Sequence, residues 1–209
     1  MAKKETKQKI LNAAELLFSE QGFSDTSLRQ ITGDAEVNLA SVNYHFGSKK
    51  DLIKAVMDRY LAIFMPNSNT ALLQLLDEPT ITLHQVFDCF VAPLMQLVAV
   101  QRRGPEIFLQ LLGRGYIDNQ GFLRWFIVNH YGEVLDNFTQ AIQKAAPGLS
   151  SADLFWRLHF TLGTVVFTMA SSEALRDIAK ADFNEDIDVE GLVRKVIPYL
   201  ASGVGAKPV

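Results

Sequence analysis

The apolar residues of this chain recur with helical spacing along nearly its whole length, and strand-like alternation is very rare. Near the start, a helix expected over 4–21 has one apolar face, formed by Ile10, Leu11, Ala14, Leu17 and Phe18. Because 48% of the residues are hydrophobic, the chain can bury a substantial core. These features predict an all-α protein.

Two short helices are expected next, over 27–34 and 39–45, joined by a tight turn. Thr26 and Asn38 are the expected N-caps, since both side chains can accept a hydrogen bond from a first-turn amide. The spacing of the apolar residues lets both helices pack on the first helix. This arrangement is typical of a helix-turn-helix unit, whose second helix enters the major groove of DNA.

A long fourth helix is expected from Ser48, which forms a capping box with Asp51. In this motif the Ser48 hydroxyl accepts from the Asp51 amide, and the carboxylate reaches back to the Ser48 amide. Pro66 should kink or end this helix, because it has no amide to donate. Further helices are expected over 82–98, 105–113, 121–144, 150–176 and 189–201. The predicted domains are a three-helix unit over 1–50, with the helix from 48 as connector, and a larger helical domain over 51–209.

One long segment carries a specific resemblance. The run "TSLRQIT…AEVNLASVNYHFGSKKDL", after "KILNAAELLFSEQGFSDTS", resembles the N-terminal DNA-binding domain of TetR-family repressors over roughly the first 60 residues. Within it, "VNLASVNYHFGSKK" resembles the fatty-acid-responsive PsrA-type branch. The resemblance implies a dimeric repressor with a C-terminal ligand-binding and dimerisation domain, which binds a near-palindromic double-stranded DNA operator.

The resemblance also implies DNA contacts. Phosphate contacts are expected from Thr26, Ser27, Tyr44, His45, Lys49 and Lys50, partly through amides at helix N-termini. Base contacts are expected from Leu39, Ala40, Ser41 and Asn43, with Asn43 able to make a bidentate contact. Arg29 could contact DNA or form a salt bridge. The alternatives are core packing for Tyr44 and an ordinary solvated surface for His45 and the two lysines.

Ten of the fourteen phenylalanines lie beyond residue 80, which suits either an ordinary core or the wall of an apolar ligand cavity. The residues expected to line a cavity are Phe87, Phe90, Arg124, Phe126, His130 and His159. The PsrA-type resemblance implies a long-chain fatty acid or acyl-CoA as the effector, and a cation for its head group could come from Arg102, Arg103, Arg114 or Arg124. His130 and His159 fit hydrogen-bonded core histidines better than metal ligands.

The last two expected helices are suited to self-association. Small residues at Gly163, Thr164, Ala170, Ser171 and Ser172 would let a partner helix approach, and the final helix carries an apolar stripe. Together they could form a four-helix bundle across a two-fold axis in a homodimer, as the resemblance implies. Packing within the monomer is the alternative.

Several function classes are not supported by the sequence. There is no Cys/His cluster, glycine-rich phosphate loop or Ser/His/Asp set, so we expect no enzyme, metal or cofactor. Cys89 is the only cysteine, and no stretch is long and apolar enough to span a bilayer, which favours a cytoplasmic protein without membrane contact. The rival functions are an activator or efflux-gene repressor with a different hydrophobic ligand, and a helical scaffold without an operator.

Overall fold

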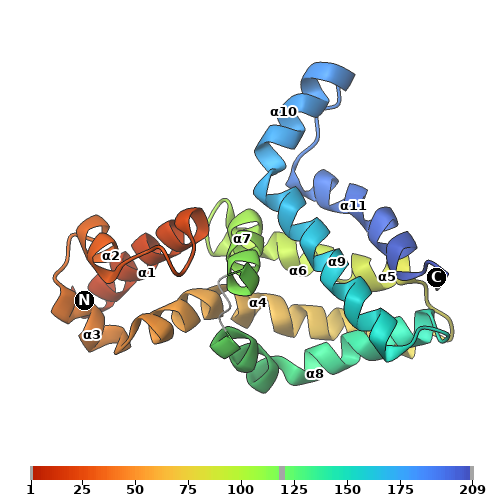
Figure 1. Ribbon diagram of the computed structural model, residues 1–209, viewed down its shortest axis with the longest axis horizontal. Coiled ribbons are helices and arrows are strands. Elements are labelled where there is room, and N and C mark those ends of the chain that lie inside the picture. Colours follow the sequence, from red (N-terminus) through yellow and green to blue (C-terminus); the bar gives the residue numbers. More distant parts are fainter. Residues whose placement is uncertain (1, 118–120, 208–209) are drawn as a thin grey trace.

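The computed structural model describes residues 2–117 and 121–207, and all regular structure in these ranges is helical, as predicted. Three helices form one end of the molecule: α1 (Ala2–Gln21), α2 (Leu28–Asp34) and α3 (Leu39–Phe46) (Figure 1). Ile31 and Val42 are fully buried against α1, and Leu28, Val37 and Phe46 pack around them. This is the predicted helix-turn-helix packing.

The long helix α4 (Lys49–Asp77) runs from this end along the body (Figure 1). The helix continues through Pro66, so of the two expected outcomes, a kink or an end, the end is wrong. The Ser48 cap forms as predicted through the Asp51 amide, which donates to Oγ over 3.1 Å. The carboxylate, however, accepts from the Ser48 hydroxyl at 2.5 Å and not from its amide.

The body is built from the remaining helices. Their bounds are α5 Leu83–Asp88, α6 Val91–Met95, the 3₁₀ helix η1 Gln96–Ala99, α7 Gly104–Ile117, α8 Gly121–Ala145, α9 Ser151–Ala170, α10 Ser172–Phe183 and α11 Val189–Val204. Helix α7 contacts both α1 and α9, so it connects the N-terminal unit with the body. Helix α10 projects away from the rest (Figure 1).

Three expected helices differ from the observed ones. The region 82–98 is three short pieces, because Pro93 has no amide and fits only the first turn of a new helix. The region 150–176 is broken at Ser171, where the backbone leaves helical geometry (φ −101°, ψ 11°). Helix α7 extends past Gly113 to Ile117.

Within the described residues, none of the helices alone has the length and apolar composition needed to cross a membrane. In the part of the chain that the structure describes, one sharply bent pair, 83–99 and 104–115, which meets at 108°, reaches that length and composition when the two helical segments are taken together.

Candidate nucleic-acid interface and ligand cavity

Helix α3 is held rigidly at both ends. Asn38 caps its start, since Oδ1 accepts from the Ser41 amide at 2.9 Å and from the Ser41 hydroxyl at 3.0 Å. Gly47 ends the helix with a φ of 79°, a left-handed conformation that favours glycine. With Val42 fully buried beneath it, α3 can present its outer face in one fixed orientation.

The outer face of α3 carries the side chains predicted to read DNA. Leu39, Ala40, Asn43 and Tyr44 are exposed, and Ser41 and His45 are half-buried. The Tyr44 side chain is 68% exposed, so the alternative that it packs in the core is wrong. The small and polar character of this surface fits contacts with base edges and phosphates.

Two lysines of α1 extend this surface. The Lys3 ammonium lies 4.7 Å from the centroid of the Tyr44 ring, and the Lys7 ammonium lies 5.8 Å from that of Phe46. Sequence reasoning did not place them in the site, although four lysines in the first ten residues were a signal for it. They add positive charge directly beside α3.

The start of α2 is capped by Ser27, and the prediction that Thr26 is the cap is wrong. The Gln30 amide donates to Ser27 Oγ at 3.2 Å, and the Ser27 amide donates to Gln30 Oε1 at 2.7 Å. The Thr26 side chain is fully buried, and its hydroxyl donates to the Gly22 carbonyl at 2.8 Å. Thr26 therefore supports the turn from inside and offers no side chain to DNA.

The remaining predicted contacts lie near the starts of α2 and α4. Arg29 is exposed on α2. The Lys49 ammonium donates to the Ser24 carbonyl at 3.3 Å, which ties α4 to the turn before α2. Lys50 is exposed, and its ammonium lies 5.8 Å from the centroid of the Phe122 ring at the start of α8.

A buried polar cluster joins the N-terminal unit to the body. Arg59 of α4 lies 2.8 Å from the Glu15 carboxylate of α1, and Glu15 is only 4% exposed. Gln101, before α7, donates to both Glu15 and the Tyr60 hydroxyl. Burial raises the pKa of Glu15, although the nearby Arg59 charge acts in the opposite direction.

Aromatic contacts lead from this cluster into the body. The Tyr60 ring stacks on the Phe108 ring of α7, with 5.8 Å between the ring centroids, and the centroids of the Phe108 and Phe64 rings lie 5.0 Å apart. Phe64 in turn lies 6.0 Å from Phe90. Since Phe64 and Phe90 line the cavity described next, packed side chains connect that cavity with α1.

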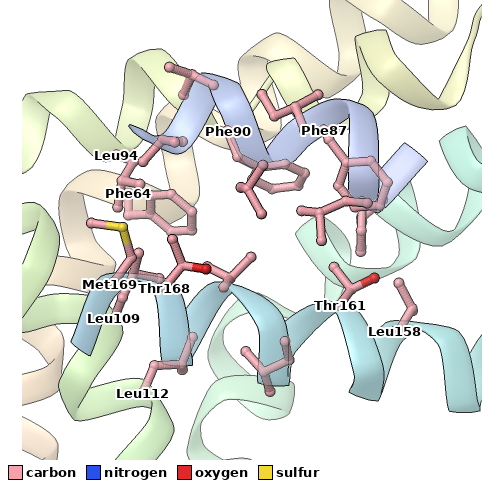
Figure 2. Close-up of a pocket in the computed structure, with 18 of the residues that line it drawn as sticks. Phe64, Phe87, Phe90, Leu94, Leu109, Leu112, Leu158, Thr161, Thr168 and Met169 are labelled. Carbon is pink, nitrogen blue, oxygen red and sulfur yellow. The ribbon is translucent and has the colours of Figure 1, made fainter. Parts of the chain in front are cut away.

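The body contains an apolar cavity of about 420 Å³, a size that suits a small organic ligand. Helices α4 to α9 and α11 all contribute to its wall, and Phe87 and Phe90 line it as expected (Figure 2). Its polar side chains are three threonines, Thr139, Thr161 and Thr168, and none of the charged residues that the structure describes lines it.

Four residues predicted to line the cavity do not: Arg124, Phe126, His130 and His159. Arg124, His130 and His159 are exposed. Phe126 is buried elsewhere, with the His130 ring 4.3 Å away. Each histidine Nδ1 lies within hydrogen-bonding distance of the carbonyl one turn earlier, at 3.0 Å for Phe126 and 2.7 Å for Phe155. Both histidines are therefore hydrogen-bonded as expected, but because they are exposed, the expectation that they lie in the core is wrong.

The other arginines considered for a head group also lie outside the cavity wall. Arg114 donates to the Glu20 carbonyl of α1 at 2.8 Å. Arg103 lies 3.9 Å from Glu173, and Arg102 is exposed. Within 2–117 and 121–207, no group of three His, Cys, Asp or Glu side chains could hold a metal ion.

The surface of α9 and α11 exposes several large aromatic side chains. They are Phe155, Trp156, Phe160, Phe167 and Tyr199. The small residues Gly163 and Thr164 lie among them on α9, whereas Ser172 is buried at the start of α10. Exposed aromatic side chains gathered on neighbouring helices are typical of a protein–protein contact.

Two family models match the chain. "Bacterial regulatory proteins, tetR family" matches residues 10–56, and "Tetracyclin repressor-like, C-terminal domain" matches residues 88–203.

Curated relatives match about a third of the chain. The probable HTH-type transcriptional regulator YttP of Bacillus subtilis is 36% identical over 66 residues, 32% of each chain. The biofilm operon icaADBC HTH-type negative transcriptional regulator IcaR of Staphylococcus aureus is 39% identical over 67 residues, 30% of this chain and 36% of its own. The chain thus spans about a third of the length of these relatives.

A solved structure matches the whole fold. A mutant of HlyIIR, with its residues 170–185 substituted by alanine, superimposes with a TM-score of 0.64. The match covers 98% of this chain and 97% of that one at 20% identity, which shows a shared fold.

Proposed function

Because this chain belongs to the TetR family of bacterial regulatory proteins, we propose that it is a ligand-responsive repressor that binds a near-palindromic operator as a dimer. Members of this family bind operator DNA and small-molecule effectors and usually act as dimers. The observation that carries the proposal is the exposed, capped face of α3 with lysines beside it. The proposed domains follow the predicted division, with residues 1–50 reading DNA and 51–209 binding the effector and the partner subunit.

The proposed DNA contacts divide into two kinds. Asn43 is the base-reading residue, because its exposed amide can pair with an adenine edge in two hydrogen bonds. Tyr44, His45, Ser27 and Lys50 contact phosphates on either side. Lys3 and Lys7 join them, since their position beside α3 supplies the positive charge that the acidic net charge of −3 conceals.

The proposed dimer forms through α9 and α11. Burying their exposed aromatic rings in a four-helix contact would remove a large apolar surface from water. Two copies of α3 would then face two half-sites on one side of the DNA.

The proposed effector is a small apolar molecule in the 420 Å³ cavity. The hydrocarbon wall suits the tail of a long-chain fatty acid or acyl-CoA, where each buried methylene contributes about 0.8 kcal/mol. Effector binding would shift the dimer to a spacing of the two α3 helices that no longer fits the operator, through the contacts from Phe64 to Tyr60 and Glu15.

The experiment is a fluorescence anisotropy titration with DNA from upstream of the protein's own gene, at two salt concentrations. We expect specific, steeply salt-dependent binding. Asn43→Ala should weaken specific binding by about 1–3 kcal/mol, whereas Lys3→Ala should weaken binding to all sequences and reduce the salt dependence. Gln140→Ala, an exposed change on α8, is the control. Binding that is insensitive to salt and to Asn43→Ala would instead favour a scaffold role.

Adding oleate or oleoyl-CoA to the same titration tests the acyl effector. Release of the protein from DNA by oleate or by oleoyl-CoA would support an acyl effector. Specific binding that neither ligand affects would favour a regulator with another hydrophobic ligand, such as an efflux-gene repressor, or an activator.

A further inference from the structure

The three threonines of the cavity are not equivalent. The Thr139 hydroxyl donates to the Leu135 carbonyl one turn earlier on α8, at 2.9 Å. Thr164 of α9, outside this cavity, does the same with Phe160 at 3.0 Å. The hydroxyls of Thr161 and Thr168, by contrast, make no hydrogen bond with any residue that the structure describes.

Both of these threonines line the cavity, and Thr161 also lines a smaller adjoining pocket. Thr161 and Thr168 project from α9 toward the side where Phe64, Phe87 and Phe90 lie (Figure 2). Seven residues along an α-helix complete two turns, so the two side chains share one face about 10 Å apart along the axis. A half-buried hydroxyl that lacks a partner loses hydrogen-bonding energy, which a ligand could restore.

The rest of the wall excludes charge. All other lining side chains are aliphatic, aromatic or thioether, and none of the arginines considered above reaches the cavity. An ionised carboxylate or phosphate placed there would lose its hydration without gaining a cation, which is very costly. A neutral hydroxyl or carbonyl group needs only a single good hydrogen bond.

We propose that the cavity binds an uncharged, mostly hydrocarbon molecule whose hydroxyl or carbonyl group hydrogen-bonds to Thr161 or Thr168. A molecule with two such groups about 10 Å apart could engage both threonines. This inference rests on the proposed function only in treating the cavity as the effector site. Among molecules that lie wholly inside the cavity, it selects an alcohol, ketone or ester of suitable length over a fatty acid or acyl-CoA, whose charged head group would have to remain outside the wall.

The test uses the purified full chain without DNA. A neutral apolar fluorescent probe, N-phenylnaphthylamine, is bound to the protein and displaced with decanol or with decanoate of the same chain length. Near neutral pH, the concentration of decanol that displaces the probe should be at least about a hundredfold lower than that of decanoate, because decanoate must first take up a proton. Decanoate should improve as the pH falls toward its pKa, and decanol should not change.

Variants locate the hydrogen bond. The nearly isosteric double variant T161V/T168V should weaken the binding of decanol, relative to that of the probe, about five- to tenfold, the effect of losing one hydrogen bond. T164V should have no effect, since that hydroxyl lies outside the cavity and is already bonded to Phe160.

Three results would overturn the inference: no binding of probe or decanol, decanoate as effective as decanol, or unchanged decanol affinity in the double variant. Operator binding without any ligand is measured separately. A failure of the displacement experiment therefore leaves the DNA-binding proposal intact, and a failure of operator binding leaves the proposal about the cavity intact.

Discussion

Helices α7 and α9 cross at Gly113, where the absence of a side chain lets them touch. A Cβ at this position would overlap one methyl of Val166, with the other methyl at 3.2 Å and the Val166 Cβ at 3.4 Å. Carbon atoms prefer about 3.5–4.0 Å, so Gly113→Ala must push the two helices apart. Such overpacking costs about 1–3 kcal/mol.

The same substitution has a favourable side. Alanine is better than glycine inside a helix by about 0.5–1 kcal/mol. In the wild-type background the clash should exceed this gain, so Gly113→Ala should lower the free energy of unfolding by about 1 kcal/mol or more. In a Val166→Ala background both Val166 methyls are gone, and the Cβ of residue 166 lies at a normal distance from the added Cβ. Gly113→Ala should then raise the free energy of unfolding by about 0.5–1 kcal/mol.

The assay is a double-mutant cycle by urea denaturation, at one fixed protein concentration because the protein is proposed to dimerise. Gly33→Ala in α2 is the control, since nothing lies within 4 Å of its added Cβ and only the helix-propensity gain should appear. The reasoning is refuted if Gly113→Ala is stabilising in both backgrounds, which would mean that α7 and α9 separate without cost.

Three further changes test the connection between the two parts and the capping of α3. Arg59→Met should cost about 3–5 kcal/mol near neutral pH, because the Glu15 carboxylate stays buried without its cation. Burial raises the pKa of Glu15 in the folded protein above its pKa in the unfolded chain. The stability that protonated Glu15 contributes is therefore complete at pH values below the unfolded-state pKa, and it is lost as the pH rises through the folded-state pKa. The cost in urea denaturation should thus shrink on acidification, and a pH-independent cost would contradict this. Gly104→Ala places a Cβ 2.6 Å from the Leu97 carbonyl carbon, so it should lower the melting temperature by more than a degree or two. A melting temperature within a degree or two of wild type would disprove the close approach. Asn38→Ala removes the cap of α3 and should cost about 1 kcal/mol in thermal unfolding and weaken operator binding, and neither effect should appear if the cap is unimportant.

Local signals allowed much of the fold to be predicted from the sequence. The caps at Asn38, Ser48, Thr82 and Ser150 all form where the spacing placed them, because each depends on residues three positions apart. The prediction of Thr26 rather than Ser27 as the N-cap of α2 was wrong because of contacts with residues distant in the sequence. Both can cap a helix, and only the packing of Thr26 under α1 leaves the role to Ser27.

The cavity could be predicted only as a region. Its wall combines residues from 64 to 200, and their meeting depends on how seven helices pack. Phe87 and Phe90 were found because aromatic density marked them, but the same reasoning included Phe126, which is buried elsewhere. The important role of Thr161 and Thr168 had no sequence signal, since a helical threonine usually bonds to its own backbone.

In the proposed mechanism, helix α4 acts as a lever arm. Between Lys49 and Phe64 it is about 22 Å long, so a tilt of about 9° about its cavity end would move the DNA-facing end by about 3.4 Å, one base-pair rise. Pro66 lacks the amide that would bond to the carbonyl one turn earlier, and it directly follows the cavity-lining Phe64 and Met65. The part of α4 that bends most easily therefore lies beside the cavity, while the part that would position α3 on DNA remains stiff.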